Sequence, residues 1–210
     1  MTLARKKTSD DIYSYLEHEL KNSIQGEVNF DEVYRQMYST DGSIYKMTPI
    51  GVTLPKNPDD VSAIIDICNK NNTAVLPRGG GTSLSGQTVN SAVVMDFSKY
   101  MNNVLEINPE ENYVITEPGI TIDNLNQRVK HTNLHFTPDP STKSRANVGG
   151  AMGNNSCGTH SVIYGKTVDQ VKEMEVILSD SSKAYFEEIS GKALEDKISL
   201  NNLEGKIYRD

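Results

Sequence analysis

The chain has 210 residues, of which 36% are hydrophobic and 23% are charged, and a formal net charge of -7. That length is enough to bury a substantial core in one or two domains. The acidic balance argues against a general nucleic-acid-binding protein, which needs clustered Lys and Arg to neutralise phosphates. No segment approaches the ~20 apolar residues that cross a bilayer, and the start, MTLARKKTSDD, contains no apolar stretch typical of a secretory signal.

The cysteines and histidines predict neither a disulfide framework nor a metal site. Cys68 and Cys157 lie far apart and lack metal-ligand spacing. His131 and His135 have helical spacing near a predicted helix end, but no third ligand accompanies them, so a surface role is favoured. Two unpaired thiols indicate a reducing compartment, and we expect a cytoplasmic protein, either free or attached to the inner face of the membrane.

Two helices are predicted in an N-terminal helical segment that covers residues 1–43. The first begins near Ser9, a suitable capping residue, and ends at about residue 23. A shorter helix is expected over residues 30–39. The apolar residues of the first helix recur on one stripe at helical spacing, namely Ile12, Tyr15, Leu16 and Leu20.

The stretch GVTLPKNPDDVSAIIDICNKNNTAVLPRGGG predicts a strand at residues 52–54, a helix, and a second strand at residues 73–76. Asn57 is a good helix cap, and Pro58 suits the first helical position. This order is typical of a right-handed β-α-β unit with parallel strands. The helix buries an apolar stripe of Val61, Ile64, Ile65 and Cys68, which gives Cys68 a packing role.

A third apolar run, AVVMD at residues 92–96, ends in Asp96, which is placed to cap a turn, and the pattern then changes. Residues 104–107 and 113–117 flank the turn-forming NPEEN and predict a hairpin. Thr121 caps a further helix, whose inward residues are Ile122, Leu125 and Val129.

Near the end of the chain one more strand is predicted, with Met174, Val176 and Leu178 on a buried face and Glu173, Glu175 and Ile177 opposite. After residue 179 the pattern fades, and the chain stops as if within an element. We therefore expect a fragment of a longer protein.

The motif LPRGGGTSLSG at residues 76–86 predicts a binding loop for phosphate or diphosphate. Consecutive glycines adopt conformations closed to other residues and let successive backbone amides point at one small volume. No lysine precedes its serine or threonine, as a Walker loop requires, and Leu84 stands where the Rossmann pattern needs its last glycine. For this motif alone, a glycine-rich surface turn is an equally good interpretation.

A second stretch, TPDPSTKSRANVGGAMGNNSCGTHSVIYG at residues 137–165, favours a ligand site. It is long, rich in small polar residues and nearly without large apolar ones, so it forms either a functional loop or a disordered one. Gly149 and Gly150 are placed to open a short helix whose amides face an anion. Cys157 lies within the stretch, where it either meets a cofactor or fills space.

Three motifs in order resemble one flavoprotein family. PRGGGTSLSGQ is followed by VVMDFSKYMNNVLEINPEENYVITEPGIT and PDPSTKSRANVGGAMGNNSCGTHSVIYGKTVDQV, and YSTDGSIY precedes them. Together they resemble the FAD-binding domain of the vanillyl-alcohol oxidase/p-cresol methylhydroxylase (PCMH) flavoproteins, most closely the D-lactate dehydrogenase and glycolate oxidase FAD-subunit branch.

The resemblance implies an α+β fold of the FAD-binding PCMH type, with two subdomains that clasp the cofactor between them. The domain would cover residues 44–210. It divides into a small parallel α/β subdomain at residues 44–103 and a second, antiparallel β subdomain with helices at residues 104–210, which we expect to be truncated.

The resemblance also implies which residues contact FAD. The diphosphate would lie against the glycine motif, the flavin and ribityl chain against the second stretch, and the adenine beside a later strand. The implied contacts are Arg78, Gly79, Gly80, Gly81, Thr82, Ser83, Gly86, Gln87, Pro138, Asp139, Ser141, Thr142, Gly149, Gly150, Asn154, Ser156, Gly158, His160, Tyr164, Gly165, Val176 and Ile177.

Thr82 stands where relatives with covalently attached FAD often carry histidine, so noncovalent FAD is expected. The family resemblance implies a dehydrogenase or oxidase that acts on a D-2-hydroxy acid such as lactate, glycolate or 2-hydroxyglutarate. Electrons would pass to a quinone, an electron-transfer protein or an iron–sulfur domain. Substrate residues would lie in a C-terminal cap domain outside this chain, which leaves the catalytic residues unknown and the fragment inactive alone.

Two alternatives remain open from the sequence. One is an isolated FAD- or nucleotide-binding module without turnover of its own. The other is a sugar-nucleotide reductase built on the same fold.

Overall fold

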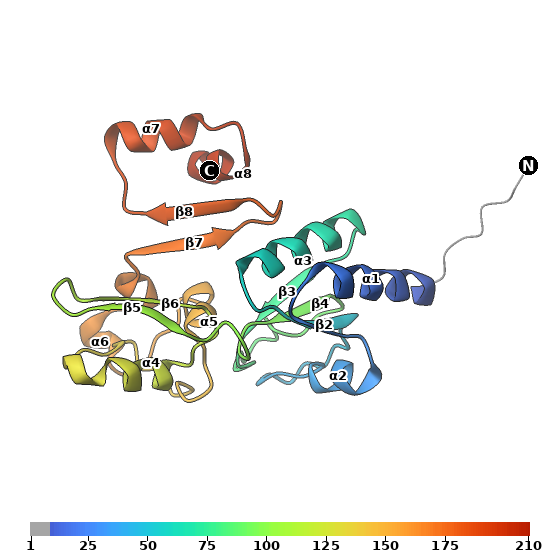
Figure 1. Cartoon of the computed structure of the whole chain (residues 1–210). Helices are drawn as coiled ribbons and strands as arrows, with labels where there is room; N and C mark the ends of the chain where they lie inside the picture. The colour runs from blue at the N-terminus through green and yellow to red at the C-terminus, as the bar shows by residue number, and fades with distance from the viewer. Residues whose placement is uncertain (1–8) are drawn as a thin grey trace, which may run out of the picture.

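The computed structural model describes residues 9–210, with side chains described from residue 13 onward. The first eight residues of the expected N-terminal segment lie outside the described residues. Figure 1 shows an α+β arrangement in which a sheet flanked by helices lies beside a second unit built from hairpins and short helices. The long loops that carry the predicted binding motifs run between the two units.

The first unit contains a four-stranded sheet in the order β1-β2-β4-β3, in which β1 is antiparallel to β2 and the other neighbours are parallel. The strands are β1 (Glu27–Asn29), β2 (Gly51–Leu54), β3 (Val75–Arg78) and β4 (Val93–Asp96). The predicted parallel relation of β2 and β3 is confirmed, with β4 between them.

The second predicted strand begins two residues later than expected. The N–H of Thr73 donates to the carbonyl of Cys68 at 2.8 Å, so Thr73 still belongs to the turn that closes the preceding helix.

Helices cover both faces of this sheet. The helices α1 (Ser9–Ser23) and α3 (Pro58–Lys70) pack on one face, and the short α2 (Glu32–Met37) packs on the other (Figure 1). Leu16 and Leu20 are completely buried against α3, and Cys68 packs in the same core as predicted. Burial raises the pKa of the Cys68 thiol to about 12, so this cysteine stays protonated.

Two helix predictions need correction. Tyr15 lies at the edge of the α1 stripe with half of its side chain exposed, because its neighbour Leu16 takes the central position against the sheet. The expected helix over residues 30–39 is shortened to α2, whose start is fixed by Asp31. The Asp31 side chain accepts hydrogen bonds from the amides of Val33 and Tyr34.

The start of α3 is fixed by two side chains. Asn57 accepts a hydrogen bond from the amide of Asp60 at 2.9 Å, as its predicted capping role requires. The buried Asp60 carboxylate in turn accepts from the backbone amides of Gln25, Gly26 and Lys56 at 2.9 to 3.0 Å. This one carboxylate therefore fixes α1, β1 and β2 around the first turn of α3.

The second unit begins with the predicted hairpin of β5 (Val104–Asn108) and β6 (Tyr113–Thr116), which are antiparallel. Helix α4 (Ile122–Val129) follows, capped by Thr121 as predicted, and its apolar residues form a separate core with Ala146, Val148 and Ala151. The remaining short elements are the 3-10 helix η1 (Lys130–Thr132), α5 (Val148–Gly153), α6 (Ser161–Tyr164) and the 3-10 helix η2 (Thr167–Gln170).

The last part of the chain contains more structure than its sequence pattern predicts. A hairpin of β7 (Glu173–Ile177) and β8 (Lys183–Glu187) is followed by α7 (Gly191–Ser199) and α8 (Leu203–Arg209). The expected single buried face of β7 is wrong, because Met174 is 41% exposed while Ile177 packs against the core of the first unit. The two helices cover the hairpin (Figure 1).

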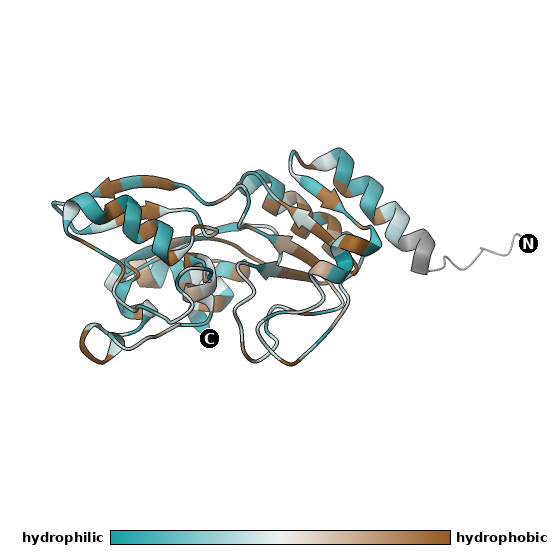
Figure 2. Cartoon of the chain, turned by 90° about the horizontal axis from the view of Figure 1, so that it is seen from below, coloured by the Kyte–Doolittle hydropathy of each residue, from teal (hydrophilic) through white to brown (hydrophobic). Residues whose placement is uncertain are grey.

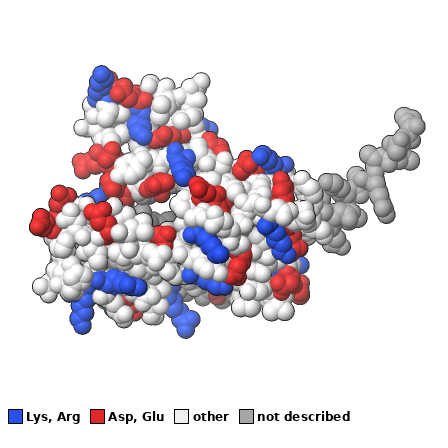
Figure 3. Space-filling model, viewed as in Figure 1, with Lys and Arg blue, Asp and Glu red and all other residues white. Residues whose placement is uncertain are grey.

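Hydropathy and charge are distributed as in an ordinary globular domain. Figure 2 shows apolar residues on the central strands and hydrophilic residues on much of the surrounding helices. On the face drawn in Figure 3, Lys and Arg are interspersed with Asp and Glu, and neither sign forms a broad patch. Within residues 9–210, no helix has both the length and the apolar character needed to cross a bilayer.

We predict that Asp60→Asn lowers the free energy of unfolding by about 2–3 kcal/mol, because an amide NH2 would face backbone donors that now bind a carboxylate. Urea denaturation followed by circular dichroism measures the change. Asp59→Asn is the matched control, since Asp59 is exposed and its ion pair with Lys183 is long at 3.5 Å. An Asp60→Asn variant as stable as the control would contradict this role.

Candidate cofactor-binding site

The glycine loop, defined as residues 79–87, leaves the carboxyl end of β3. Ligand sites of parallel sheets form at this edge, where the loops that follow the strands converge. Gly81 and Gly86 have φ angles of +64° and +75°, which L-residues with a side chain rarely adopt. The loop therefore needs glycine at these two positions to fold back over the sheet.

The glycine loop packs directly on the second predicted wall. A Cβ on Gly80 would lie 2.0 Å from the carbonyl oxygen of Arg145, and one on Gly79 would lie 2.6 Å from Asn147 Oδ1. Gln87 Nε2 also reaches Asn154 Oδ1, at the end of α5, at 3.4 Å. The two motifs that the sequence predicts as one site are thus in contact, and any side chain at Gly80 would separate them.

Asn147 joins three segments at the centre of this contact. Its side-chain amide donates to the carbonyl of Gly119, and its backbone pairs with Thr121. Its Oδ1 is buried beside Gly79 and has no hydrogen-bond partner among the described residues. Asn147 occupies the position before α5, but its side chain makes no capping hydrogen bond to that helix. The side chain instead connects the segment before α5 to Gly119.

The backbone amides of the glycine loop are free to bind a ligand. Among residues 9–210, no protein acceptor receives the N–H groups of residues 80–84. By contrast, the amides of Ser85 and Gln87 donate to Ser83 Oγ at 3.4 and 3.3 Å. Five consecutive donors without acceptors, on a loop that excludes side chains, fit an anionic group such as a diphosphate.

The proline-rich start of the second stretch packs against its far end. A Cβ on Gly158 would lie 2.0 Å from the carbonyl oxygen of Asp139, a residue held at φ +47°. Ser161 Oγ also reaches the carbonyl of Pro138 at 3.3 Å. This contact folds the stretch into a compact wall rather than a disordered loop.

Charged side chains reinforce the same contact. The Asp139 carboxylate lies 2.6 Å from Lys143 Nζ and 3.1 Å from His160 Nδ1. The hydrogen bond from Lys143, together with the nearby positive charge, lowers the pKa of Asp139, which therefore remains ionised at neutral pH. His160 thus has a protein partner within the wall, which accounts for its position without a cofactor contact.

An open pocket of about 350 Å³ lies on this wall. Cys157 is exposed and faces the pocket, so the alternative that it fills core space is wrong. The pocket is lined by Asp139, Pro140, Ser141, Lys143, Cys157, Gly158 and Thr159.

Other expected contacts lie elsewhere. The β7 residues Val176 and Ile177 are far along the chain from the glycine loop, and Ile177 packs against the first core. Tyr164 ends α6 with 48% of its side chain exposed, and Gly165 turns away at φ +82° against Asp169. Contacts of these four residues with a cofactor remain predictions.

His131 and His135 are both exposed, which agrees with a surface role. No group of three metal-ligating side chains is found among the described residues.

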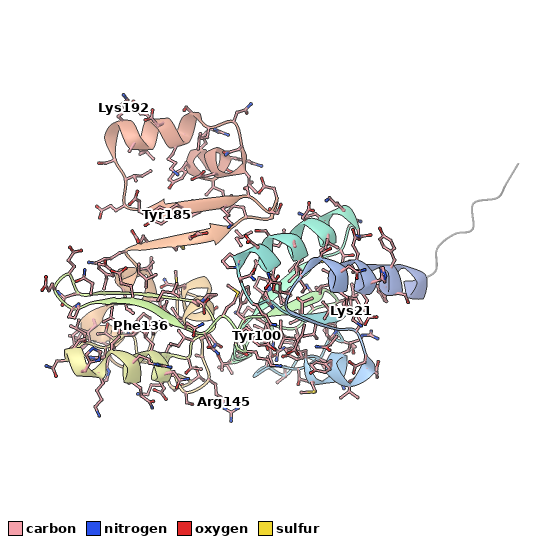
Figure 4. All side chains as sticks on the ribbon, in the orientation of Figure 1. Lys21, Tyr100, Phe136, Arg145, Tyr185 and Lys192 are labelled. Carbon is pink, nitrogen blue, oxygen red and sulfur yellow. The ribbon has the colours of Figure 1, made fainter. Side chains whose placement is uncertain are left out.

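Sequence reasoning missed Asn147 and the backbone of Arg145. Both lie within the second stretch, just before Gly149 and Gly150, where the spacing of glycines carries no information about which neighbours these residues contact. Figure 4 shows the Arg145 side chain extending outward where the two units meet, and its backbone carbonyl is what meets Gly80.

The free amides of the glycine loop, packed against a wall of small polar residues, suit a large, phosphate-bearing cofactor. A family model described as FAD binding domain matches residues 49–183. The chain therefore belongs to the FAD-binding domain family, and its cofactor is FAD.

Two curated relatives share clear sequence identity. The chain is 36% identical over 194 residues to D-2-hydroxyglutarate dehydrogenase of Pseudomonas putida, a match that covers 90% of this chain and 19% of that protein. It is 35% identical over 162 residues to the glycolate oxidase subunit GlcD of Bacillus subtilis, covering 75% and 34%. The chain thus spans about a fifth of the length of the first of these relatives.

Solved structures share the fold. Alkyldihydroxyacetonephosphate synthase superposes with a TM-score of 0.75 at 19% identity, covering 99% of this chain and 38% of that one. p-Cresol methylhydroxylase superposes with a TM-score of 0.69 at 17% identity, covering 88% and 37%. The α+β architecture is therefore the PCMH-type FAD-binding fold that the sequence predicts.

We predict that Gly150→Ala weakens FAD binding about tenfold without lowering stability. No atom lies within 4 Å of a Cβ at Gly150, so an added methyl group would project into the open space before α5 and obstruct only a ligand there. Fluorescence titration with FAD and urea denaturation separate the two effects. Gly153→Ala is the matched control, because its Cβ also meets no atom within 4 Å. Equal FAD affinity in both variants would exclude Gly150 from the site.

Proposed function

We propose that this chain is the FAD-binding part of a flavin-dependent dehydrogenase that oxidises a D-2-hydroxy acid such as lactate, glycolate or 2-hydroxyglutarate. The observation that carries the proposal is the row of free amides on the glycine loop, packed against the start of α5. The choice of substrate class is supported by two 2-hydroxy-acid enzymes among the relatives, which match 90% and 75% of the chain.

In this proposal the glycine loop binds the diphosphate of FAD through backbone amides and the hydroxyls of Thr82 and Ser83. The walls formed by residues 138–142, by Gly149 and Gly150, and by Asn154, Ser156 and Gly158 hold the ribityl chain and the flavin. The strand β7 would contribute to the adenine side through Val176 and Ile177. The protein contributes walls that bind and orient the cofactor. FAD itself would accept the hydride that leaves the carbinol carbon of the substrate.

In this proposal the substrate is held mainly by residues outside the region that this chain shares with its relatives. Its relatives carry most of their length outside the matched region. The chain also leaves apolar side chains exposed near the proposed flavin wall, with Val162 at 92% and Ile163 at 78% exposure. Exposed apolar residues in such a wall are typical of surfaces covered by a ligand or by another domain.

Further parts of the proposal concern the setting of the enzyme. Electrons would leave the reduced protein for a quinone, an electron-transfer protein or an iron–sulfur domain. The two unpaired cysteines support a cytoplasmic location, free or at the inner face of the membrane.

The proposed division into subdomains at residues 44–103 and 104–210 is supported by two separate cores. The described part of the N-terminal segment joins the first of these cores through Leu16 and Leu20.

FAD is expected to bind noncovalently, because Thr82 offers no nucleophile of the histidine type at the end of the glycine run. Acid precipitation of the FAD-loaded chain should leave a colourless pellet and all the flavin in the supernatant. A pellet that retains flavin absorbance after washing would contradict noncovalent binding while leaving FAD binding intact.

The FAD-loaded chain is expected to keep its visible flavin absorbance when D-2-hydroxyglutarate, D-lactate or glycolate is added under anaerobic conditions. The reason is that the proposed substrate residues lie outside its 210 residues. Fused to a cap domain from a 2-hydroxy-acid relative, the same chain should be bleached by one of these acids.

A fusion that binds FAD and is bleached by none of the three acids would favour a binding module without turnover. A chain without affinity for FAD would contradict the proposed function altogether.

A further inference from the structure

We propose that residues 38–43, here called the brace segment, orient the amides of the glycine loop toward the diphosphate, with Arg78 and Gly42 as positioning residues. The brace segment precedes the matched family region, which begins at residue 49. The inference rests on the proposed function, because it gives Arg78 a positioning role in place of the FAD contact that the family resemblance implies.

The Arg78 guanidinium binds backbone carbonyls rather than a ligand. Nη2 donates to the carbonyl of Thr40 at 2.8 Å, and Nη1 donates to those of Tyr38 at 3.2 Å and Thr88 at 2.9 Å. The guanidinium also lies over the Tyr38 ring, 5.2 Å from its centroid. Arg78 therefore ties the brace segment to both ends of the glycine loop, because the loop begins directly after Arg78 and ends directly before Thr88.

The position of the Arg78 side chain explains one glycine of the motif. A Cβ on Gly81 would lie 2.6 Å from Arg78 Nη2. The guanidinium passes beneath the loop at this point, on the side of the brace segment. A guanidinium that donates three hydrogen bonds to carbonyls on that side is poorly placed to act as the main anion contact on the other.

Gly42 determines which way the loop peptides face. Its N–H donates to the carbonyl of Gly81 at 2.8 Å. A Cβ on Gly42 would lie 3.0 Å from the carbonyl oxygen of Ser83 and 3.2 Å from that of Thr82. Three successive carbonyl oxygens of the glycine loop therefore gather around Gly42.

This arrangement points the loop amides in the opposite direction. In a trans peptide the N–H is antiparallel to the carbonyl of the preceding residue. With the carbonyls of residues 81–83 directed at the brace segment, the N–H groups of residues 82–84 must face away from it. These are among the N–H groups that have no acceptor within the described chain.

Two further hydrogen-bonded ties hold the brace segment in place. The Asp41 carboxylate accepts from Thr88 Oγ1 at 2.8 Å and from the amide of Ser43 at 2.8 Å. Burial opposes ionisation of Asp41, but these hydrogen bonds outweigh it and lower the pKa of Asp41. The Tyr38 hydroxyl donates to Asp96, at the end of β4, at 2.5 Å. The brace segment is thus anchored to the sheet as well as to the loop.

The first test is Gly42→Ala, which adds a methyl group among the three carbonyls. We expect FAD to bind about tenfold more weakly, because the amides lose their common direction toward a charged group. Gly153→Ala is the control, since its Cβ meets open space. Urea denaturation checks folding, and hydrogen exchange of the amides of residues 82–84 provides a readout that stability alone would not change. FAD should slow their exchange in the wild-type chain and far less in Gly42→Ala.

The second test, Arg78→Lys, separates positioning from direct anion contact. Lysine keeps the positive charge but cannot bond the carbonyls of Tyr38, Thr40 and Thr88 together. A positioning role predicts about tenfold weaker FAD binding, whereas a direct charge contact predicts nearly unchanged binding. Arg128→Lys is the control, because Arg128 is an exposed arginine in the last turn of α4, outside both glycine-containing motifs.

The outcomes distinguish the inference from the proposed function. If the wild-type chain binds FAD and both variants bind it equally well, the brace segment has no positioning role and the proposed function stands. If the variants lose affinity only in proportion to their loss of stability, the inference is likewise wrong. If the wild-type chain does not bind FAD, the proposed function fails for this chain and the inference falls with it.

Discussion

The close contact between the glycine loop and the residues before α5 is the constraint on which the site depends. At Gly80 only hydrogen fits, because the carbonyl of Arg145 occupies the position that a Cβ would take. The contact joins an α/β unit and an antiparallel unit, each of which has its own cluster of buried apolar residues. The two halves of the site approach closely because glycine has no side chain, and not because large apolar residues interlock there.

This kind of contact also explains how an acidic chain is suited to an anionic cofactor. The net charge is -7, and the arginine nearest the glycine loop is engaged with backbone carbonyls. In the proposed site, oriented amide dipoles acting over a short distance attract the phosphate. Such a site attracts anions only at close range and discriminates by shape, because amides in fixed directions match one geometry of the diphosphate.

Much of the fold and part of the site could be predicted from the sequence. Asn57, Pro58 and Thr121 mark helix starts through local hydrogen bonds, and these predictions are confirmed. The glycine loop was recognisable because its composition departs from any packed element. Asn147 was not, because its role depends on segments 28 and 68 residues away, Gly119 and Gly79, that no local pattern connects.

The last forty residues show a different limit of sequence reasoning. The strand β7 buries residues according to its position against α3, not according to simple alternation, so Met174 and Ile177 exchange the expected environments. Asn69 of α3 donates to the carbonyl of Ser179 at 2.6 Å, a contact across 110 residues that places the hairpin turn. Local periodicity contains no information about a contact of this kind.

The brace segment has a practical consequence for how such domains are exchanged between proteins. A recombinant domain cut at the family boundary, residue 49, would retain every glycine of the loop but lose the carbonyls and the amide that set its orientation. A domain can therefore keep the sequence of the glycine loop and still lose the orientation of the loop amides. A chimera would need its own residues 38–43, or a substitute with the same backbone path, because the ties to Arg78 and Gly81 run through main-chain atoms of this segment.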